Sequence, residues 1–419
     1  MPEKNLLLIC NTFPPTPGIG GRRWAKFCKY LALNGYKIHV ATSENLSEGI
    51  SEWNKDIANN FVIVTHPLNF KYRRLFLKPR GIFEKIVRKI IVKKLALTKH
   101  SERFLTSLPN PEAWQKIKDI LIRENIKTII VSGDPFLFYY ATQLKKETGC
   151  RLILDYRDLW NDHSFYRKYL RLTDKQWSFF EEAENSALKA CDTVITVDEH
   201  LKQILSKRLT AEEKGKIHVI HNGFDADDFT DTTPAKREKD KKITLYFSGN
   251  IATDLNEIVL HFANCFLKLK QNLPQTYSGI EIHLKGKMDN SLFKKISALN
   301  LENLILDNNF VNLKTYNEEV LQADMGILLL SEEYAHSYTT KFSDYLFLNK
   351  KMLVLGYPGE ISTFLKSNNC GDIFTMNETY SFFEKIPTLC KTTTAYSEKT
   401  KETFSVKNLT NELISLLEN

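Results

Sequence analysis

The feature that most constrains the fold is an alternation of short apolar runs with segments of helical periodicity. In the first half of the chain, apolar runs occupy 6–11, 36–42, 127–133, 150–156 and 192–197. Strands of a parallel sheet are buried on both faces, so they form continuous apolar runs, and amphipathic helices connect them. The alternation therefore predicts an α/β fold with a parallel sheet covered by helices.

The same alternation starts again after a polar, charge-rich stretch at 231–242, which is typical of an interdomain linker. The second series of apolar runs lies at 243–249, 280–286, 303–308, 325–331, 351–356 and 371–375. We therefore predict an N-terminal domain at 1–235 and a C-terminal domain at 236–395. The remaining residues, 396–419, contain one more amphipathic helix.

Composition excludes several classes of protein. The chain has 419 residues, of which 42% are hydrophobic, enough to build packed cores and too many for a disordered chain. No apolar run approaches the ~18 residues that would span a bilayer, and the charged start of the chain does not resemble a signal peptide. Seven scattered cysteines without a Cys-x-x-Cys pair predict reduced thiols in a cytoplasmic protein.

The positive net charge of +8 comes from one segment. Residues 71–99 hold eleven of the 58 Lys and Arg residues and one of the 50 acidic residues, which leaves 47 basic and 49 acidic residues elsewhere. Within this segment, apolar residues recur at helical spacing from Ile82 to Ile91. The basic residues that lie largely between them, and that we predict to contact a membrane surface, are Lys85, Arg88, Lys89, Lys93 and Lys94.

A basic amphipathic helix of this kind suits an anionic membrane surface. The alternative is a helix that packs on the first domain with a solvated basic face. No motif of a nucleic-acid-binding fold accompanies the segment, so we do not expect nucleic acid as a partner.

A glycine-rich loop follows the first apolar run and precedes the first helical segment. Gly18, Gly20 and Gly21 lack Cβ atoms, so backbone N–H groups can approach an anion there, and Arg22 and Arg23 add positive charge. Arg23 stands where a dinucleotide-binding motif has its last glycine. We predict an anion site, because α/β sheets bind ligands at the carboxyl ends of strands. The alternative is a tight turn in which the glycines serve only geometry.

A charged cluster follows the run at 150–156. Asp155, Arg157, Asp158 and His163 form either a structural ion-pair network or the wall of an active site, and the sequence leaves both open. Asp158 is suited to orient or deprotonate a hydroxyl group. His163 is suited to donate a hydrogen bond or to act as a base.

The second half has its own candidates at 337–353, between an apolar run and a helical segment. Thr339 and its neighbours Ser337 and Thr340 can cap the helix. Lys341 lies in the first turn, where a cation opposes the helix dipole, so we expect an anionic partner such as a phosphate. Asp344 follows one turn later and is suited to accept hydrogen bonds from a ribose diol. The alternative is a surface helix with a salt bridge.

Two further motifs carry weaker signals. The loop after 243–249 contains Gly249, and Asp254 with Glu257 has the spacing of a capping box. A phosphate is plausible there, although no Lys or Arg is near. The Asp-x-Asp motif at 225–228 is interpreted as a turn and helix cap. No histidine pairing suggests a ligand set, so no metal site is predicted.

Taken together, these motifs resemble a glycosyltransferase of family 4 with the GT-B fold. The resemblance covers nearly the whole chain and is carried by the segments 13–42, 152–160, 219–225 and 338–356. It implies two Rossmann-like domains that face an interdomain cleft, with the C-terminal helix returning to the N-terminal domain. It also implies a nucleotide-sugar donor in the second domain, an acceptor on the first, transfer with retention, and no metal or cofactor.

The resemblance also assigns roles to individual residues. Gly20, Gly21 and Gly249 would lie at the donor diphosphate with Lys341. Asp344 would contact the ribose, and Phe310 and Val311 the base. Asp158 would lie among acceptor-side polar groups. From the residue types themselves, we expect Asp158 and His163 to serve catalysis and Arg22 and Arg157 to lie on the acceptor side.

Two positions depart from the pattern of the family. His336 stands where the family often has a glutamate that contacts the donor sugar. Asn250 and Ile251 stand where Arg and Lys are usual, and we predict that Lys285 or Lys287 supplies the missing charge.

The sequence thus predicts a hexosyltransferase that is peripheral on the inner face of the cell membrane. It would transfer a sugar to a hydroxyl of a glycan in surface polysaccharide biosynthesis. In one version of the hypothesis this glycan is lipid-linked. The alternatives are a nucleotide-sugar epimerase of the same fold and a non-catalytic protein that binds glycan or a membrane surface.

Overall fold

The computed structural model describes residues 4–46, 49–58, 60, 62–68, 75, 79–94, 111–162, 173–230, 242–391 and 394–418. The chain forms two compact units: unit 1 comprises 1–221 and 406–419, and unit 2 comprises 222–405. The first division, after residue 221, therefore falls before the predicted boundary at 235. The second, after residue 405, falls after the predicted boundary at 395. Most of the predicted linker at 231–242 lies outside the described residues.

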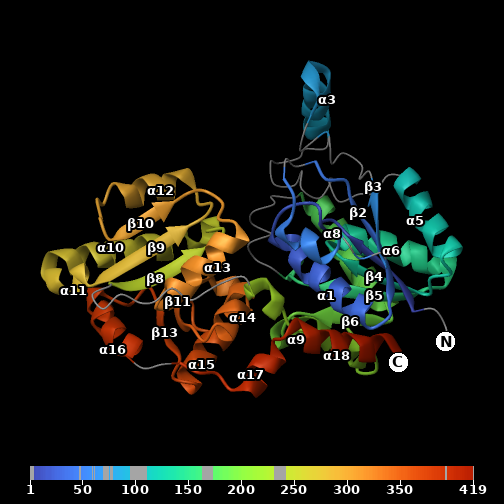
Figure 1. The fold of residues 1–419 in the computed structure, drawn as a ribbon. Coiled ribbons are helices and arrows are strands. Elements are labelled where there is room, and N and C mark those ends of the chain that lie inside the picture. The colour runs from blue at the N-terminus through green and yellow to red at the C-terminus, as the bar shows by residue number, and fades with distance from the viewer. Residues whose placement is uncertain are drawn as a thin grey trace. The chain divides into compact units, whose positions relative to one another are not determined.

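Unit 1 is built on a parallel seven-stranded sheet of the described residues (Figure 1). Its order is β3 (Ile63–Leu68), β2 (Lys37–Ser43), β1 (Asn5–Cys10), β4 (Thr128–Ser132), β5 (Arg151–Tyr156), β6 (Thr193–Thr196) and β7 (Ile217–Val219). The central strands are buried along nearly their whole length, as expected for a sheet with helices on both faces.

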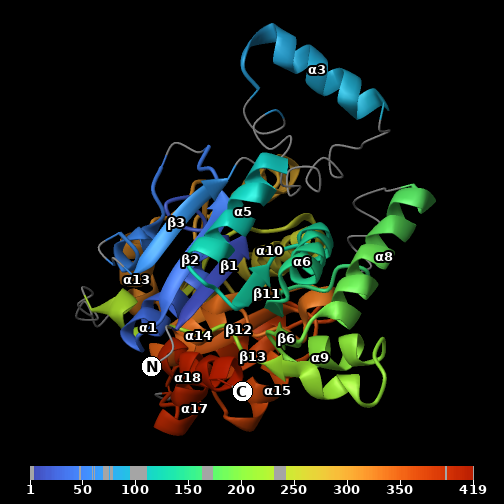
Figure 2. The ribbon, with the colours of Figure 1, turned by 90° about the vertical axis from the view of Figure 1, so that its right-hand side faces the viewer.

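Helices cover both faces of this sheet. One face packs against α5 (Pro111–Arg123), α6 (Pro135–Thr148) and α8 (Asp174–Ala190), which share a core with Leu7 and Ile9 of β1. On the other face, α1 (Arg22–Leu33) contacts the C-terminal helix α18 (Val406–Glu418) (Figure 2). Arg151 of β5 donates hydrogen bonds to the carbonyls of Leu416 and Leu417, at 2.7 and 3.1 Å. The predicted return of the terminal helix is confirmed.

The edge strand β3 is absent from the predicted set of strands. It pairs with β2 alone, so it lies at the edge of the sheet. Pro67 lacks a backbone donor and is tolerated there because an edge strand leaves one side unpaired. Pro67 and the polar Thr65 and His66 also interrupt the apolar run by which the other strands were predicted.

Unit 2 repeats the design with a parallel six-stranded sheet. Its order is β10 (Leu304–Asp307), β9 (Ile280–Lys285), β8 (Ile243–Ser248), β11 (Met325–Leu330), β12 (Lys351–Gly356) and β13 (Gly371–Phe374). One core cluster gathers around α10 (Asn256–Asn272), α11 (Pro274–Ser278), α12 (Asn290–Ser297) and α16 (Ile386–Lys391). A second gathers around α13 (Leu313–Gln322), α14 (Thr340–Phe347) and α15 (Glu360–Ser367).

Three predicted helix and turn caps have different outcomes. Thr339 is the N-cap of α14 and accepts a hydrogen bond from the Phe342 N–H, and Asp225 caps the turn at 226–229, as predicted. The capping box of Asp254 and Glu257 is wrong, because α10 begins at Asn256 with Leu255 as its N-cap. A 3₁₀ turn, Thr253–Leu255, separates Asp254 from the helix.

In both sheets the order of the strands reverses at the first strand of the unit. β1 lies between β2 and β4, and β8 lies between β9 and β11. In open parallel sheets, ligands bind outside the carboxyl ends of the strands at such a switch point. The glycine loops after β1 and β8 therefore occupy equivalent positions in the two units. Within the described residues, no helix combines the length and apolar character needed to cross a membrane.

We predict that Leu413→Ala destabilises unit 1. Leu413 is buried on α18, and removing a buried leucine side chain typically costs about 2–5 kcal/mol of unfolding free energy. The measurement is thermal unfolding of the full chain, in which the transition of unit 1 should shift to lower temperature. Lys407→Ala, at an exposed position of the same helix, is the matched control and should leave both transitions in place.

Candidate functional site

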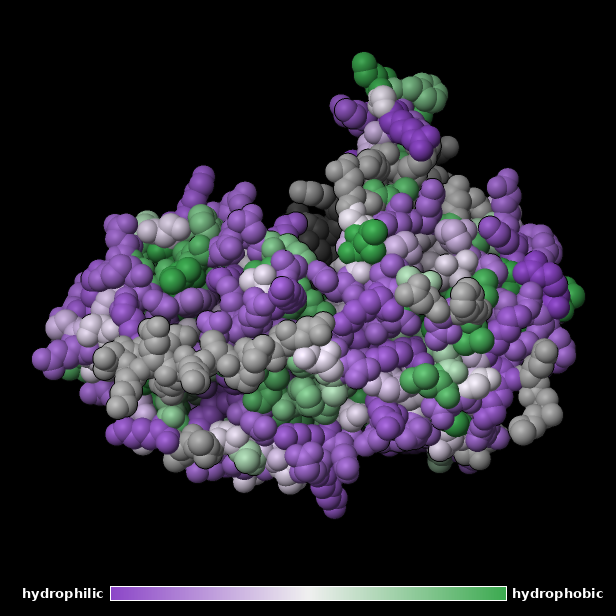
Figure 3. Space-filling model, viewed as in Figure 1, coloured by the Kyte–Doolittle hydropathy of each residue, from purple (hydrophilic) through white to green (hydrophobic). Residues whose placement is uncertain are grey.

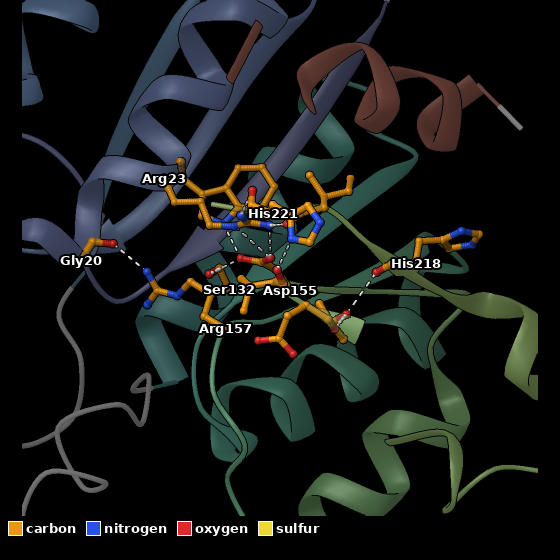
Figure 4. A network of polar contacts seen from close by, with 12 residues as sticks. Gly20, Arg23, Ser132, Asp155, Arg157, His218 and His221 are labelled. Atoms are coloured by element: carbon orange, nitrogen blue, oxygen red, sulfur yellow. Dashed lines mark hydrogen bonds and ion pairs between the residues drawn. The ribbon is translucent and has the colours of Figure 1, made fainter. Parts of the chain in front are cut away.

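The strand ends of unit 1 are joined by a buried polar network centred on Asp155 (Figure 4). The Asp155 carboxylate is fully buried at the end of β5 and accepts hydrogen bonds from three side chains. Ser132 of β4 and Trp24 of α1 donate to it at 2.8 Å each, and Arg23 of α1 pairs with it at 3.2 Å. For Asp155 the structure therefore selects the structural alternative.

Arg23 extends the network to the end of β7. Its guanidinium donates hydrogen bonds to the carbonyls of Ile220 and His221, both at 2.9 Å. Burial lowers the pKa of Arg23, and the neighbouring Asp155 carboxylate opposes that shift. The charge of Arg23 is thus compensated within unit 1. The sequence suggested that Arg23 adds positive charge at the surface of the glycine loop, and this prediction is wrong.

The glycine loop itself is held by Arg157, which follows β5. Arg157 donates a hydrogen bond to the carbonyl of Gly20 at 2.8 Å (Figure 4). Gly18 has a φ of 113°, a conformation that favours glycine. A Cβ on Gly21 would lie 3.4 Å from the Pro14 ring, an ordinary contact distance, so the available space does not require glycine there. Arg22 is 3% exposed, and its guanidinium lies over the Trp53 ring at 5.1 Å.

The second carboxylate of this cluster, Asp158, is available to bind a ligand. It is half-buried, and no hydrogen bond or ion pair to it occurs among the described residues. His163 lies outside the described residues, so its predicted role stays a prediction.

The sequence analysis missed Ser132 and His221 at the strand ends and Trp24 on α1 as members of the network. His221 follows β7, and its Nδ1 lies 2.8 Å from the Val197 carbonyl; burial lowers the pKa of its imidazole. For Ser132 and His221 the available signal was their position, since Ser132 lies near the end of the apolar run at 127–133 and His221 lies in the segment 219–225 that carries the family resemblance.

In unit 2 the strand-end loops pack with very little space between them. Gly286, after β9, has a φ of 109°, and a Cβ there would lie 2.8 Å from the carbonyl carbon of Gly249. Gly249, after β8, has a φ of 153°, and a Cβ there would lie 2.5 Å from Nζ of Lys341. The Lys341 ammonium therefore lies against the Gly249 backbone, at the switch point of the sheet.

The Gly249 N–H is not available for a phosphate, because it donates to the Lys285 carbonyl at 2.9 Å. What this glycine provides is space for Lys341, whose ammonium also lies over the Phe247 ring at 5.2 Å. The predicted charge of Lys285 is taken up as well: its ammonium pairs with Glu319 of α13 at 2.5 Å. Lys287, two residues on, is exposed.

The other predicted donor contacts are spread over the same side of unit 2. Asp344 is buried on α14, and the Tyr316 hydroxyl of α13 donates to its carboxylate at 3.4 Å. Phe310 is 80% exposed in the loop between β10 and α13, while Val311 packs against the core of unit 2. His336 is half-buried in the segment before α14.

No group of three or more His, Cys, Asp or Glu side chains that could hold a metal occurs in the part of the chain that the structure describes. The expectation of metal independence is therefore neither supported nor contradicted.

Comparison with known proteins supports the family resemblance and the fold. Residues 84–228 match the model described as Glycosyltransferase Family 4, which confirms the resemblance over that segment. No curated protein matches the sequence.

Several solved structures share the fold over almost the whole chain. One is described as trehalose-6-phosphate from E. coli bound with UDP-2-fluoro glucose, with 8% identity, a TM-score of 0.62 and 99% of both chains covered. Another is UDP-GlcNAc 2-epimerase from Neisseria meningitidis bound to UDP-GlcNAc, with 12% identity, a TM-score of 0.54, and 99% of this chain and 100% of that chain covered. At such low identities the structural similarity shows the fold alone: two Rossmann-like units of the GT-B type.

We predict that Asp155→Asn destabilises unit 1 strongly. The substitution leaves the buried guanidinium of Arg23 without its counter-charge, and breaking a buried pair typically costs about 3–5 kcal/mol. Chemical unfolding of the full chain measures the loss. The double variant Arg23→Met/Asp155→Asn should recover part of it, because both charges are then absent. If Asp155→Asn unfolds like wild type, the carboxylate is not the centre of the network.

We also predict that Gly286→Ala disturbs the strand-end loops of unit 2. The new Cβ would meet the Gly249 carbonyl, and the backbone there favours glycine, so we expect a loss of about 1–3 kcal/mol. Gly279→Ala is the matched control at the other end of β9, where a Cβ would lie 3.6 Å from its nearest neighbour. Equal unfolding transitions for the two variants would contradict the close approach of the loops.

Proposed function

We propose that this chain, with its family 4 match and GT-B fold, is a retaining glycosyltransferase. It would move a hexosyl residue from a nucleotide-sugar donor to a hydroxyl group of a glycan. The observation that carries the proposal is the Lys341 ammonium, which lies against Gly249 at the switch point of unit 2. A cation in the first turn of α14 opposes the helix dipole, so a bound diphosphate would remove an unfavourable interaction.

The donor site would be built from the carboxyl ends of β8 and β9 and the start of α14. Lys341 would contact the diphosphate, with Lys287 as an additional cation. Asp344 would accept hydrogen bonds from the ribose once Tyr316 gives way, and the exposed Phe310 would stack on the base. Similar structures hold UDP sugars, so UDP is the first nucleotide to test.

In the proposed reaction, the acceptor hydroxyl oxygen forms a bond to the anomeric carbon of the donor. The bond from that carbon to the diphosphate oxygen breaks, and the nucleoside diphosphate leaves. The hydroxyl proton would pass to the carboxylate of Asp158. Lys341 stabilises the charge that develops on the leaving group, which is electrostatic catalysis by a preorganised cation and asks for no metal.

On the acceptor side, we assign the hydroxyl contact to Asp158, because it has no partner among the described residues. Arg157 holds the Gly20 loop beside it, and His163 is the second candidate for proton transfer. We propose a lipid-linked glycan as the acceptor and surface polysaccharide biosynthesis as the process. The place of action would be the inner face of the cell membrane.

A nucleotide-sugar epimerase is the second candidate, because the same fold occurs in UDP-GlcNAc 2-epimerases. The two functions differ in their products. A transferase incubated with donor and acceptor releases a nucleoside diphosphate and forms a glycosidic bond, whereas an epimerase changes the configuration of the sugar without an acceptor. Chromatography of the products distinguishes them.

We predict that Lys341→Ala weakens binding of UDP or of the matching nucleoside diphosphate. A hydrogen bond to a charged group contributes about 1.5–3 kcal/mol, so Kd should rise by about tenfold to a hundredfold. Calorimetric titration without added metal measures the change. Wild-type protein should also melt at a higher temperature with the nucleotide present, because the ligand binds only the folded state.

Lys366→Ala, at an exposed position of α15, removes the same charge away from the strand ends and should bind the nucleotide as wild type does. If no nucleotide or nucleotide sugar binds wild-type protein, the donor site is wrong. If Lys341→Ala binds as tightly as wild type, a different cation contacts the diphosphate.

A further inference from the structure

The helix α3 (Gly81–Lys94) carries an exposed apolar stripe that no described element covers (Figures 1 and 2). Ile82, Ile86 and Ile90 recur every fourth residue and are 78%, 49% and 58% exposed, and Phe83 beside them is 77% exposed. Figure 3 shows hydrophobic and hydrophilic residues next to one another on this helix. Contiguous exposed apolar surface of this kind marks a surface that contacts a partner or a membrane.

A stripe of lysines runs beside the isoleucines. Lys85, Lys89 and Lys93 are all exposed, and each follows one of the three isoleucines by three residues. Residues three apart are neighbours on a helix surface, so the two stripes lie side by side along α3. The exposed side thus combines apolar side chains with long cationic ones whose ammonium groups can reach outward past them.

The other side of α3 has a different character. Val87, Arg88, Ile91 and Val92 are half-buried, as is Glu84, the acidic residue of this helix, which accepts a hydrogen bond from the Arg80 N–H. The exposed side therefore carries positive charge without acidic neighbours on the helix. The side chain of Lys94 lies outside the described residues.

We propose that the exposed side of α3 inserts into the surface of a bilayer that contains anionic lipids. The isoleucines and Phe83 would enter the boundary between headgroups and acyl chains, while the lysines contact the lipid phosphates. Fourteen residues of helix measure about 21 Å, less than the ~30 Å of a hydrocarbon core, so α3 lies in the plane of the surface. A second copy of the chain is a poorer occupant, because two such helices would bring lysines together.

The place of α3 in the topology connects this contact with the candidate site. β3, the strand before α3, ends at the carboxyl edge of the sheet, where Gly20 and Arg157 also lie. Resting on the proposed function, this means that α3 brings the acceptor side of unit 1 to the membrane in which a lipid-linked acceptor resides. The membrane contact itself does not depend on that function.

The test is sedimentation of the full chain with vesicles. Wild-type protein should sediment with vesicles of equal parts phosphatidylcholine and phosphatidylglycerol, and at least tenfold less with phosphatidylcholine alone. Replacing Lys85, Lys89 and Lys93 together by Gln should lower the partition coefficient about a hundredfold, since each lysine near anionic lipid contributes about fivefold. Replacing Ile82, Ile86 and Ile90 by Ser should also lower it about a hundredfold.

Two controls match these variants. Ile122→Ser changes an isoleucine on α5 that is 75% exposed, and Lys294→Gln/Lys295→Gln removes exposed charges from α12. Both should sediment as wild type does. All α3 side chains changed are exposed, so the variants should keep the melting temperature of wild type.

Three results would overturn the proposal: wild type fails to sediment with anionic vesicles, the α3 variants sediment as well as wild type, or the Ile variant only dissolves a dimer seen by size-exclusion chromatography. Donor binding is measured separately by titration with UDP. Failure of the wild-type protein to bind anionic vesicles, with intact nucleotide binding, would refute the membrane contact alone. Vesicle binding without any nucleotide binding would refute the proposed transferase and leave the membrane contact in place.

Discussion

The arrangement of strand ends in unit 1 depends on the buried carboxylate of Asp155. A charge without solvent must be compensated by hydrogen bonds and by an opposite charge, and here these come from α1 and β4. Arg23 also binds the carbonyls that follow β7. The start of α1 is thereby fixed against the ends of three strands. The glycine loop lies immediately before α1, so its position is a consequence of the same network.

Unit 2 fixes the equivalent loop by a different force. There, a Cβ at Gly286 would meet the backbone of Gly249, and a Cβ at Gly249 would meet the ammonium group of Lys341. The loop after β8 is therefore set by steric exclusion, and the loop after β1 is set by charge. We therefore expect a substitution that changes charge to disturb the loop after β1, and one that adds volume to disturb the loop after β8. Both loops lie at the switch point of a parallel sheet.

The sequence predicted the parts of the fold that local patterns determine. Long periodic segments were located well: the amphipathic helix expected within 396–419 is α18 (Val406–Glu418). β3 was not predicted because Pro67 and polar residues interrupt its apolar run. An edge strand tolerates such an interruption. The partners of Asp155 were beyond prediction, because Ser132 and Arg23 meet it through tertiary packing. Lys285 was assigned to a phosphate, whereas the alternation along β9 places it with Glu319.

The pairing of Lys285 bears directly on how the unit compensates for the cations missing after β8. Its ammonium is neutralised by Glu319, so on the proposed function other groups would have to meet the diphosphate. Lys341 meets the requirement of position, because it lies against Gly249. A lysine in the first turn of a helix costs about 0.3–1 kcal/mol through the dipole, and packing over Phe247 holds it there nonetheless. On the proposed function, an anionic ligand at this position would offset the cost that the helix dipole imposes on Lys341.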